Sequence, residues 1–299
     1  MSIRLTIMRA GPLTGIQDAG RFGMLRHGIS ASGPMDAGAY AQAGALAGSG
    51  QGGVEFTMAG LEIRLEQGQC RMGYAGGDFV VKRNGRVLDW PGSAVLEVGD
   101  VLAITPGQWG NYGYLRFDAD IAVPEVMGSM ATSSRAGLGG LDGRVLRAGD
   151  MIELTGGRGA GTAAAAVRPE PVTGSIRVVW GLHADMFPQA LREQFLATAF
   201  TVSSRLDRMG VRLADGAGVF AGLDSLSLVS DAIVPGDIQI LGDGTPIVLM
   251  RDHQPTGGYP RIATIVSADL DRFAQLRPGS PVAFEPVTVE HAHALLRSR

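Results

Sequence analysis

The chain has 299 residues, a formal net charge of −3, and 45 glycines. This length can bury a substantial core and favours two domains or one elaborate domain. The charge balance offers no broad basic surface, so nucleic acid is excluded as an expected partner. A hydrophobic fraction of 45% excludes global disorder.

Two residue types occur only once. Lys82 is the only lysine, so the chain lacks the lysine of a phosphate-binding loop and one placed for biotin attachment or Schiff-base chemistry. Arginine must therefore supply any anion-binding cation. Cys70 is the only cysteine, which excludes an intrachain disulfide, favours a reducing compartment and predicts a buried structural thiol.

The sequence shows no sign of a membrane segment or of export. The N-terminal residues MSIRLTIMRAG lack the long apolar centre of a signal peptide. No run approaches the roughly 18 apolar residues that a membrane helix needs. We therefore expect a soluble, cytoplasmic protein with no membrane partner.

Short apolar runs separated by Gly, Asp and Pro predict a mainly β protein. Residues 3–9 alternate and predict a first strand, and residues 54–154 predict a series of strands and turns. Within this series Asn84-Gly85 predicts a type I′ hairpin turn, because both central positions of that turn need a positive φ. The runs 95–104, 145–154 and 276–285 share one pattern, which predicts a strand entered through a Gly-centred turn.

Three segments are predicted to be helical. The alanine-rich run at 37–48 follows Asp36, whose side-chain oxygen can accept from the free amides of a first turn. Residues 187–200 carry apolar side chains near helical spacing. Residues 288–299 predict a final helix with arginines in its last turn.

The domain boundary is predicted within residues 156–171, which are rich in glycine and alanine and close on two prolines. We therefore expect an N-terminal lobe at residues 1–160, a linker at 161–172 and a C-terminal lobe at 173–299.

Residues 203–261 are the stretch in which polar side chains gather around glycines and prolines at the ends of short predicted strands. Such segments fit binding or catalytic loops held by a rigid scaffold. They fit a run of hairpin turns with solvated polar residues equally well. The polar and aromatic residues concerned are Asp207, Arg208, Gln239, Asp252, His253, Thr256 and Tyr259.

Two motifs resemble the family known as allophanate hydrolase subunit 2, KipA-type, or biotin-dependent carboxyltransferase. The first is TGIQDAGRFGMLRHGISASGPMD at residues 14–36. The second begins at DRMG (207–210) and continues through PGDIQ, TGGYP and SADL to AQLRPG, which ends at Gly279. With further matches at 127–129 and 137–150, the resemblance spans nearly the whole chain. It departs from the family pattern at Gly44, Tyr112, Leu206 and residues 116–120.

The resemblance implies two cyclophilin-like β-barrel lobes with a few short helices. It also implies the C subunit of an ATP-dependent 5-oxoprolinase, which opens 5-oxo-L-proline to L-glutamate together with the A and B subunits. Two alternatives stay open. One is a biotin-dependent carboxyltransferase component acting on urea or a similar small amide, with biotin on a separate carrier. The other is a non-catalytic regulatory partner of a KipI-type kinase inhibitor.

These candidate reactions handle a small planar amide, which needs donors for its carbonyl and acceptors for its N–H. Gln17 and Gln239 carry both kinds of group. Arg21 and Arg208 can hold an oxyanion with two parallel bonds. The backbone of Thr256, Gly257 and Gly258 could face a developing negative charge, with Tyr259 beside it. Asp207 and Asp252 are the candidate general acid or base.

Each of these assignments has a structural alternative. Asp18, Asp36 and Asp243 are expected to cap or close turns. Asp207 next to Arg208 can form an ion pair that links strands. His253 is a weaker catalytic candidate because it lies beside the motif. His291 and His293 fall on different faces of a predicted helix, so we expect no metal site there.

Overall fold

The computed structural model describes residues 2–48, 50–157, 165–223 and 228–298. The chain forms two compact units, and each is described by itself. The first unit contains residues 1–22 and 31–171, and the second contains residues 23–30 and 172–299. Of the predicted linker, residues 161–164 lie outside the described residues.

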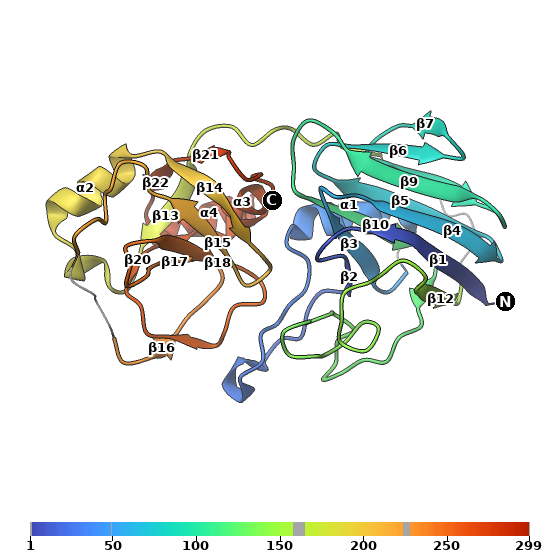
Figure 1. The fold of residues 1–299 in the computed structure, drawn as a ribbon, viewed down its shortest axis with the longest axis horizontal. Helices are drawn as coiled ribbons and strands as arrows, with labels where there is room; N and C mark the ends of the chain where they lie inside the picture. Colours follow the sequence, from blue (N-terminus) through green and yellow to red (C-terminus); the bar gives the residue numbers. More distant parts are fainter. Residues whose placement is uncertain (1, 49, 158–164, 224–227, 299) are drawn as a thin grey trace. The chain divides into compact units, whose positions relative to one another are not determined.

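The first unit consists of two antiparallel sheets (Figure 1). The seven-stranded sheet, in the order β11-β12-β1-β4-β9-β6-β7, contains β1 (Ile3–Ala10), β4 (Leu61–Gln67), β6 (Phe79–Arg83), β7 (Arg86–Leu88), β9 (Val101–Pro106), β11 (Asp120–Ile121) and β12 (Met151–Thr155). The five-stranded sheet, in the order β2-β3-β10-β5-β8, contains β2 (Gly15–Gln17), β3 (Gly53–Thr57), β5 (Cys70–Gly76), β8 (Gly92–Leu96) and β10 (Tyr112–Phe117).

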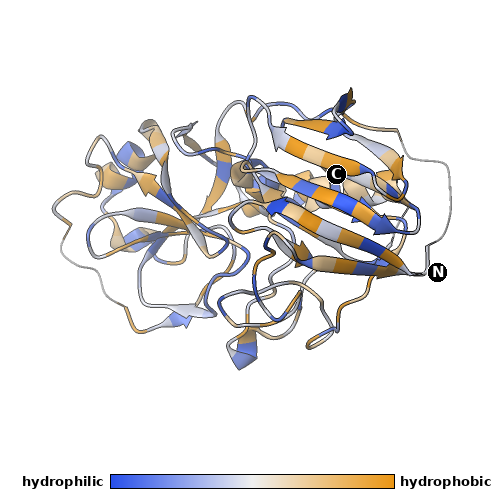
Figure 2. Cartoon of the chain, turned by 45° about the vertical axis from the view of Figure 1, so that its right-hand side comes forward, coloured by the Kyte–Doolittle hydropathy of each residue, from blue (hydrophilic) through white to orange (hydrophobic). Residues whose placement is uncertain are grey.

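One hydrophobic core takes side chains from both of these sheets. Leu5 and Ile63 come from the seven-stranded sheet, and Phe56 and Leu115 from the five-stranded sheet. Hydrophilic and hydrophobic residues alternate along β1 and β4 (Figure 2), because successive side chains of a strand point to opposite faces. Cys70 is buried in this core, and burial raises the pKa of its thiol to about 12, so the predicted structural thiol is confirmed.

Helix α1 (Ala37–Ala47) packs on β5 and β10 of the five-stranded sheet. The Asp36 carboxylate accepts from Ala39 N at 2.8 Å, so the predicted N-cap is confirmed. The helix approaches β5 closely at Gly73, where a Cβ atom would collide with the backbone of Ala43 and Ala47. Only glycine fits at this contact.

The predicted hairpin between β6 and β7 is confirmed. Asn84 and Gly85 have φ values of 50° and 83°, as a type I′ turn requires.

The three related runs contain one repeated turn. Gly99, Gly149 and Gly279 have φ values of 92°, 91° and 87°. In each turn the glycine N–H donates to the carbonyl of one residue in a neighbouring strand. The carbonyl of the residue after the glycine accepts from the N–H of that same strand residue. The partners are Leu65, Ile7 and Val202, in the order of the three glycines. The predicted Gly-centred turn is therefore confirmed at all three places.

The second unit is built on one eight-stranded sheet in the order β21-β14-β15-β18-β17-β20-β13-β22. Its strands are β13 (Ile176–Trp180), β14 (Phe200–Leu206), β15 (Gly210–Ala214), β17 (Asp237–Ile240), β18 (Pro246–Leu249), β20 (Arg261–Ile265), β21 (Pro281–Val282) and β22 (Phe284–Pro286). The outermost strands, β21 and β22, are separated in sequence only by Ala283, so the sheet curls into a near-closed barrel. A two-stranded ribbon pairs β16 (Asp231–Ala232) with β19 (Thr256–Gly257).

Short helices complete the second unit: η1 (Leu25–His27), η2 (Ala184–Met186), α2 (Gln189–Ala197), α3 (Ser267–Ala274) and α4 (Val289–Arg297). Helix α4 matches its prediction. Helix α2 is shorter than predicted, because the chain enters β14 at Phe200. Helix α3, a short helix with no side-chain cap at its start, was not predicted from the sequence. The predicted mainly β fold with a few short helices is confirmed.

Within the described part of the chain, no helix is both long and apolar enough to cross a membrane.

Candidate functional site

The segment 203–261 contributes three adjacent strands of the barrel, β15, β18 and β17, together with both strands of the ribbon, and it ends at Arg261, the first residue of the next strand, β20. Gln239 on β17 pairs across the sheet with Arg261 on β20, next to a register shift after Ile238. Such irregularities re-aim side chains at the ends of strands. The polar residues of the sequence motif fall into two groups: Gln239 lies against Gly257 and Tyr259 beside the ribbon, and Arg208 pairs with Asp252 at the β14–β15 turn.

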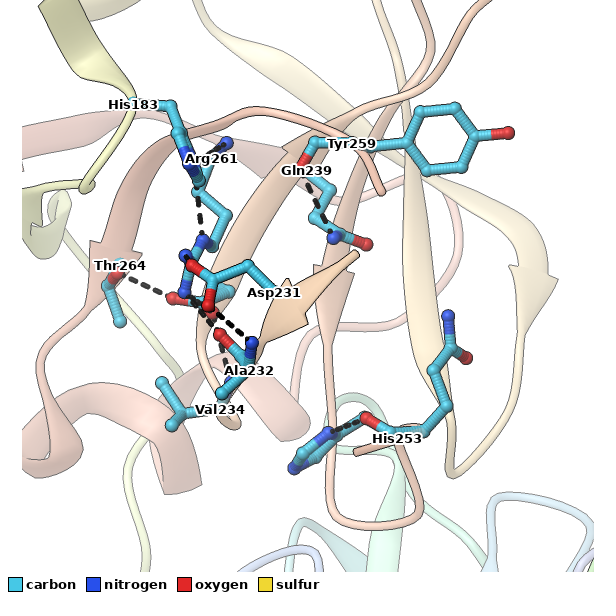
Figure 3. A network of polar contacts seen from close by, with 11 residues as sticks. His183, Asp231, Ala232, Val234, Gln239, His253, Tyr259, Arg261 and Thr264 are labelled. Atoms are coloured by element: carbon cyan, nitrogen blue, oxygen red, sulfur yellow. Dashed lines mark hydrogen bonds and ion pairs between the residues drawn. The ribbon is translucent and has the colours of Figure 1, made fainter. Parts of the chain in front are cut away.

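Gln239 is the predicted amide-binding residue of this unit, and its side chain lies under the ribbon. It is 1% exposed, and its Nε2 donates to the carbonyl of Tyr259 at 3.4 Å (Figure 3). Gly257 lies directly against this amide, because a Cβ atom there would come within 2.6 Å of Nε2. A side chain at position 257 would therefore require the Gln239 side chain or the ribbon to shift.

Of the predicted backbone donors, Thr256 and Gly257 belong to the ribbon, and Gly258 directly follows it. Thr256 and Gly257 pair with Ala232 and Asp231 of β16. The Gly258 carbonyl accepts from Leu228 N at 2.9 Å. Tyr259 follows; the residue is 40% exposed, and in Figure 3 its ring points away from Gln239. These residues lie next to Gln239, as expected for one wall of a binding site, and their role in catalysis stays a prediction.

Arg261 organises a polar network that sequence reasoning missed. Its Nη2 lies 2.5 Å from Asp231 and its Nη1 3.4 Å from Asp237, while Nη1 also donates to the carbonyl of Ala232 at 2.7 Å (Figure 3). His183 accepts from Arg261 Nε at 3.4 Å through its Nδ1. Arg261 thereby ties the ribbon to the barrel. In the sequence, Arg261 could have been recognised by its position directly after the TGGYP motif.

Arg208 and Asp252 form a buried bidentate ion pair. Arg208 Nε donates to Oδ2 at 3.0 Å and Nη2 to Oδ1 at 3.2 Å, and both side chains are less than a tenth exposed. The Asp252 amide also donates to the Arg208 carbonyl at 2.7 Å. These contacts hold the β14–β15 turn against the end of β18, which is a structural task. The suggested roles of Arg208 as an anion clamp and Asp252 as an acid or base stay predictions.

The proposed ion pair between Asp207 and Arg208 is wrong, because Arg208 pairs with Asp252. Asp207 instead closes its own turn, since its Oδ1 accepts from Met209 N at 2.8 Å and Gly210 N at 3.0 Å. The expectation that aspartates close turns is met at Asp243, which accepts from Thr245 N, and at Asp18, which accepts from Gly20 N.

His253 is buried, and desolvation lowers the pKa of its imidazole. The ring is therefore held neutral. Its Nδ1 lies 2.6 Å from the carbonyl of Gln254 (Figure 3). A carbonyl can only accept, so Nδ1 carries the proton and Nε2 keeps a lone pair. Chemically, this nitrogen can accept a proton or a hydrogen bond.

Gln17 and Arg21, the other predicted binding residues, belong to the first unit. Gln17 lies on β2, and its Nε2 donates to the Thr132 carbonyl at 3.1 Å. The Gln17 Oε1 is buried with no hydrogen-bond partner among the described residues. Arg21 is also buried, and it donates to three backbone carbonyls that hold one loop, those of Val126, Ser129 and Ala131. The proposed role of Arg21 in binding an oxyanion stays a prediction.

A buried carboxylate in the first unit was also missed. Glu55 accepts from Met35 N and from the Tyr114 hydroxyl, each at 2.8 Å, and Tyr114 in turn accepts from Asp36 N. Burial and the nearby Glu55 charge raise the pKa of Tyr114, which keeps its hydroxyl protonated as a donor. This chain of bonds fixes the SGPMD segment. In the sequence, Glu55 could have been recognised as a glutamate inside an otherwise apolar predicted strand.

Two departures from the family pattern lie in contact. The Arg116 guanidinium carbon lies 4.0 Å from the centroid of the Tyr40 ring, and a Cβ at Gly44 would come within 2.9 Å of Arg116 Nη1. The arginine therefore occupies space that a side chain at position 44 would fill.

Among the described residues, no group of three or more His, Cys, Asp and Glu side chains is arranged to hold a metal ion.

The carboxyltransferase domain family, subdomain A and B, has a family model that matches residues 27–286. The chain belongs to this family. It is 34% identical to the C subunit of 5-oxoprolinase from Escherichia coli, over 96% of this chain and 93% of that protein. It is 32% identical to the C subunit of 5-oxoprolinase from Haemophilus influenzae, over 94% and 91% of the two chains.

The fold agrees with this assignment. The crystal structure of the Kluyveromyces lactis urea amidolyase superposes with a TM-score of 0.86 at 26% identity. The match covers 99% of this chain and 19% of the much longer urea amidolyase chain.

Proposed function

We propose that this chain is the C subunit of an ATP-dependent 5-oxoprolinase, which opens 5-oxo-L-proline to L-glutamate together with the A and B subunits. The observation that carries the proposal is the 34% identity over nearly the full length of both this chain and the C subunit of the Escherichia coli 5-oxoprolinase.

The geometry supports binding of a small planar amide. Gln239 offers an amide edge beneath Gly257, where the absence of a side chain leaves the backbone close to that edge. The neutral His253 offers a lone pair on Nε2 in the same segment. We assign Gln239 to orientation of the lactam, and the ribbon backbone to the oxygen on which negative charge develops.

The nucleotide is proposed to bind through the complex. Hydrolysis of an unstrained lactam is hard to drive, and activation of the lactam oxygen by ATP would supply the driving force. Lys82, the only lysine, is exposed at the end of the β6–β7 hairpin and follows no glycine-rich loop. Partner subunits therefore supply the phosphate-binding groups in this proposal. A reducing, cytoplasmic location fits the single, buried Cys70.

The test is capture of the native complex from a lysate, followed by an assay for ATP hydrolysis coupled to 5-oxoproline. Turnover is expected only when all three subunits are present. Gln239→Leu should lower kcat/KM by about tenfold or more, because a buried hydrogen-bonding group is lost. The matched control is Gln194→Leu, an exposed position on α2. Full turnover by Gln239→Leu, or none by the complete complex, would contradict the proposal.

A second candidate is a biotin-dependent carboxyltransferase component acting on urea or a similar amide. The urea amidolyase superposition and the family name favour it. Biotin would have to arrive on a separate carrier, because Lys82 lies in a hairpin with no biotin-attachment motif. Co-purification with a biotinylated protein under mild lysis would support this function, and its absence would count against it.

A further inference from the structure

A groove of the second unit lies beside the last residues of β13 and the first turn of α4. Its volume is about 790 Å³, and most of the residues that line it are apolar. Two of them, Trp180 and Val289, are 40% and 53% exposed, and Leu182, two residues beyond Trp180, is 80% exposed. Large apolar side chains exposed close together are typical of an interaction surface.

The hydrogen-bond ladder between β13 and β22 stops at this groove. The two strands pair in parallel, and Val287 N donates to the Val178 carbonyl at 2.8 Å at the end of the ladder. One step further along a parallel ladder, Trp180 would bond to Val287 and Val289. The chain instead begins α4 at Val289, with Thr288 as the N-cap. The ladder therefore ends one step before β13 does.

The edge of β13 is open at Trp180. Gly181 N donates to the Ile262 carbonyl of β20 at 2.9 Å, so the backbone groups of Gly181 face β20 and those of Trp180 face the opposite side. Among the residues that the structure describes, the N–H and the carbonyl of Trp180 form no hydrogen bond. A strand edge with free backbone groups is a template for the addition of another strand.

The carboxylates at the groove are not neutralised by ion pairs. Glu285 lines the groove and Glu290 lies in the first turn of α4; both are exposed, and neither belongs to an ion pair within the described part of the chain. The other titratable lining residue is His291. The arginines of the neighbouring elements are already used in ion pairs with aspartates: Arg177 with Asp269, and Arg192 with Asp185. The charge at the groove therefore favours a basic residue on the partner.

We propose that this groove binds an extended segment of a partner protein. The segment pairs with the open edge of β13 at Trp180, packs aliphatic side chains against Leu182 and Val289, and presents a basic residue to Glu285. An extended segment supplies both an acceptor and a donor for the free backbone groups of Trp180. A helix has its own backbone groups paired and would leave those of Trp180 unused. A small apolar ligand would leave them unused as well.

The first test measures fluorescence anisotropy of the fluorescein-labelled peptide KVTVKV with the full chain. This peptide has a free extended backbone, aliphatic residues and basic residues. Saturable binding at millimolar concentration or below is expected, and no binding overturns the proposal.

Three altered peptides separate the contributions. Two versions of KVTVKV carry N-methyl groups at alternate residues, in opposite phase, and one of them should bind about tenfold more weakly because it cannot donate to the edge. Equal binding by both overturns the added strand. The acidic peptide EVTVEV should bind more weakly than KVTVKV at low salt, since carboxylates then meet carboxylates. Equal binding by these two peptides overturns the basic partner.

The second test places the peptide on the groove. Leu182→Lys removes an exposed apolar contact and adds a charge that repels the basic peptide, so KVTVKV should bind about tenfold more weakly. Glu285→Lys should have an effect in the same direction at low salt. The matched controls are Val87→Lys and Glu125→Lys, at exposed residues of the first unit, and both should bind as the unaltered chain does. Unchanged binding by Leu182→Lys overturns the proposal. If melting curves show that this variant does not fold, Glu285→Lys decides in the same way.

Sedimentation of the chain alone tests the alternative that a second copy covers the edge. A monomer is expected. A dimer that Leu182→Lys dissociates would overturn the proposal, because the occupant would then be another copy of this chain. None of these tests depends on the proposed function, since they need neither partner subunits nor turnover.

Discussion

Two of the arginine–aspartate clusters in the second unit differ in their access to water. In the Arg208–Asp252 pair the two side chains are 8% and 7% exposed. In the Arg261 cluster the Asp231 side chain is 52% exposed, although Arg261 itself is only 5% exposed. Water competes for Asp231 but hardly reaches Asp252. From this difference we expect the β14–β15 turn to be held more firmly than the ribbon.

The largest effect is expected for Asp252→Ala, which removes the buried carboxylate that Arg208 contacts through two hydrogen bonds. Removal of one partner of a buried ion pair costs about 3–5 kcal/mol of unfolding free energy. Urea denaturation followed by circular dichroism measures this loss. The double variant Arg208→Met with Asp252→Leu should recover most of it, because no charge is then left buried. A cost for Asp252→Ala no larger than that of Asp185→Ala, at an ion pair whose Asp185 is 98% exposed, would contradict the comparison.

The next effect is expected at the contact between the ribbon and the barrel. Gly257→Ala places a Cβ within 2.6 Å of Gln239 Nε2, so the ribbon or the glutamine must move. Overpacking of this kind costs about 1–3 kcal/mol. The control is Gly216→Ala, where an added Cβ meets nothing within 4 Å. Thermal denaturation should separate the two variants, and equal melting temperatures would show that the ribbon does not rest on Gln239.

A smaller change in stability is expected for Asp231→Asn, because exposed ion pairs contribute about 1 kcal/mol or less. The ribbon, however, loses its charged tie to Arg261. Hydrogen exchange of the amides in β16 and β19 should become faster while exchange in the barrel strands stays unchanged. Asp185→Asn is the matched control at an exposed pair. Faster exchange throughout the unit would indicate general destabilisation instead.

The smallest effect is a dependence of stability on pH that comes from His253. Burial lowers its pKa in the folded state, so between the folded and unfolded pKa values the unfolded chain binds more protons. The stability that comes from the neutral ring is therefore present above the unfolded pKa of about 6.5 and is lost as the pH falls through the folded pKa. His253→Asn keeps a donor for the Gln254 carbonyl and cannot titrate. Urea denaturation at several pH values should show a shallower acid slope for this variant.

Local chemistry was readable from the sequence wherever neighbouring residues decide it. Asp36 caps α1, Asn84-Gly85 turns the β6–β7 hairpin, and the repeated Gly-centred turn recurs at Gly99, Gly149 and Gly279. In each case the residue acts on backbone groups a few positions away or sets its own φ. The order of strands and turns follows from the same short-range signals.

Partners distant in the sequence could not be read in this way. Because the two residues are neighbours in the sequence, Asp207 was the expected ion-pair partner of Arg208. In the fold the partner is Asp252, 44 residues further along the chain. The buried tie between Glu55 and Tyr114 spans 59 residues, and the contact of Arg116 with Gly44 joins a strand to a helix. Such pairs depend on how strands align in the sheets.

The sequence by itself therefore determined the mainly β class, most of the helices and the turns, and the segment 203–261 as a place where polar groups gather. Only the tertiary structure decided what those groups do: Arg208 and Asp252 neutralise each other, Arg261 ties down the ribbon, and Gln239 lies beneath Gly257. The physical reason is the distance along the chain over which each kind of interaction acts. Turn and capping preferences act over a few residues, whereas a buried charge takes whichever opposite charge the packed sheet brings within hydrogen-bonding distance.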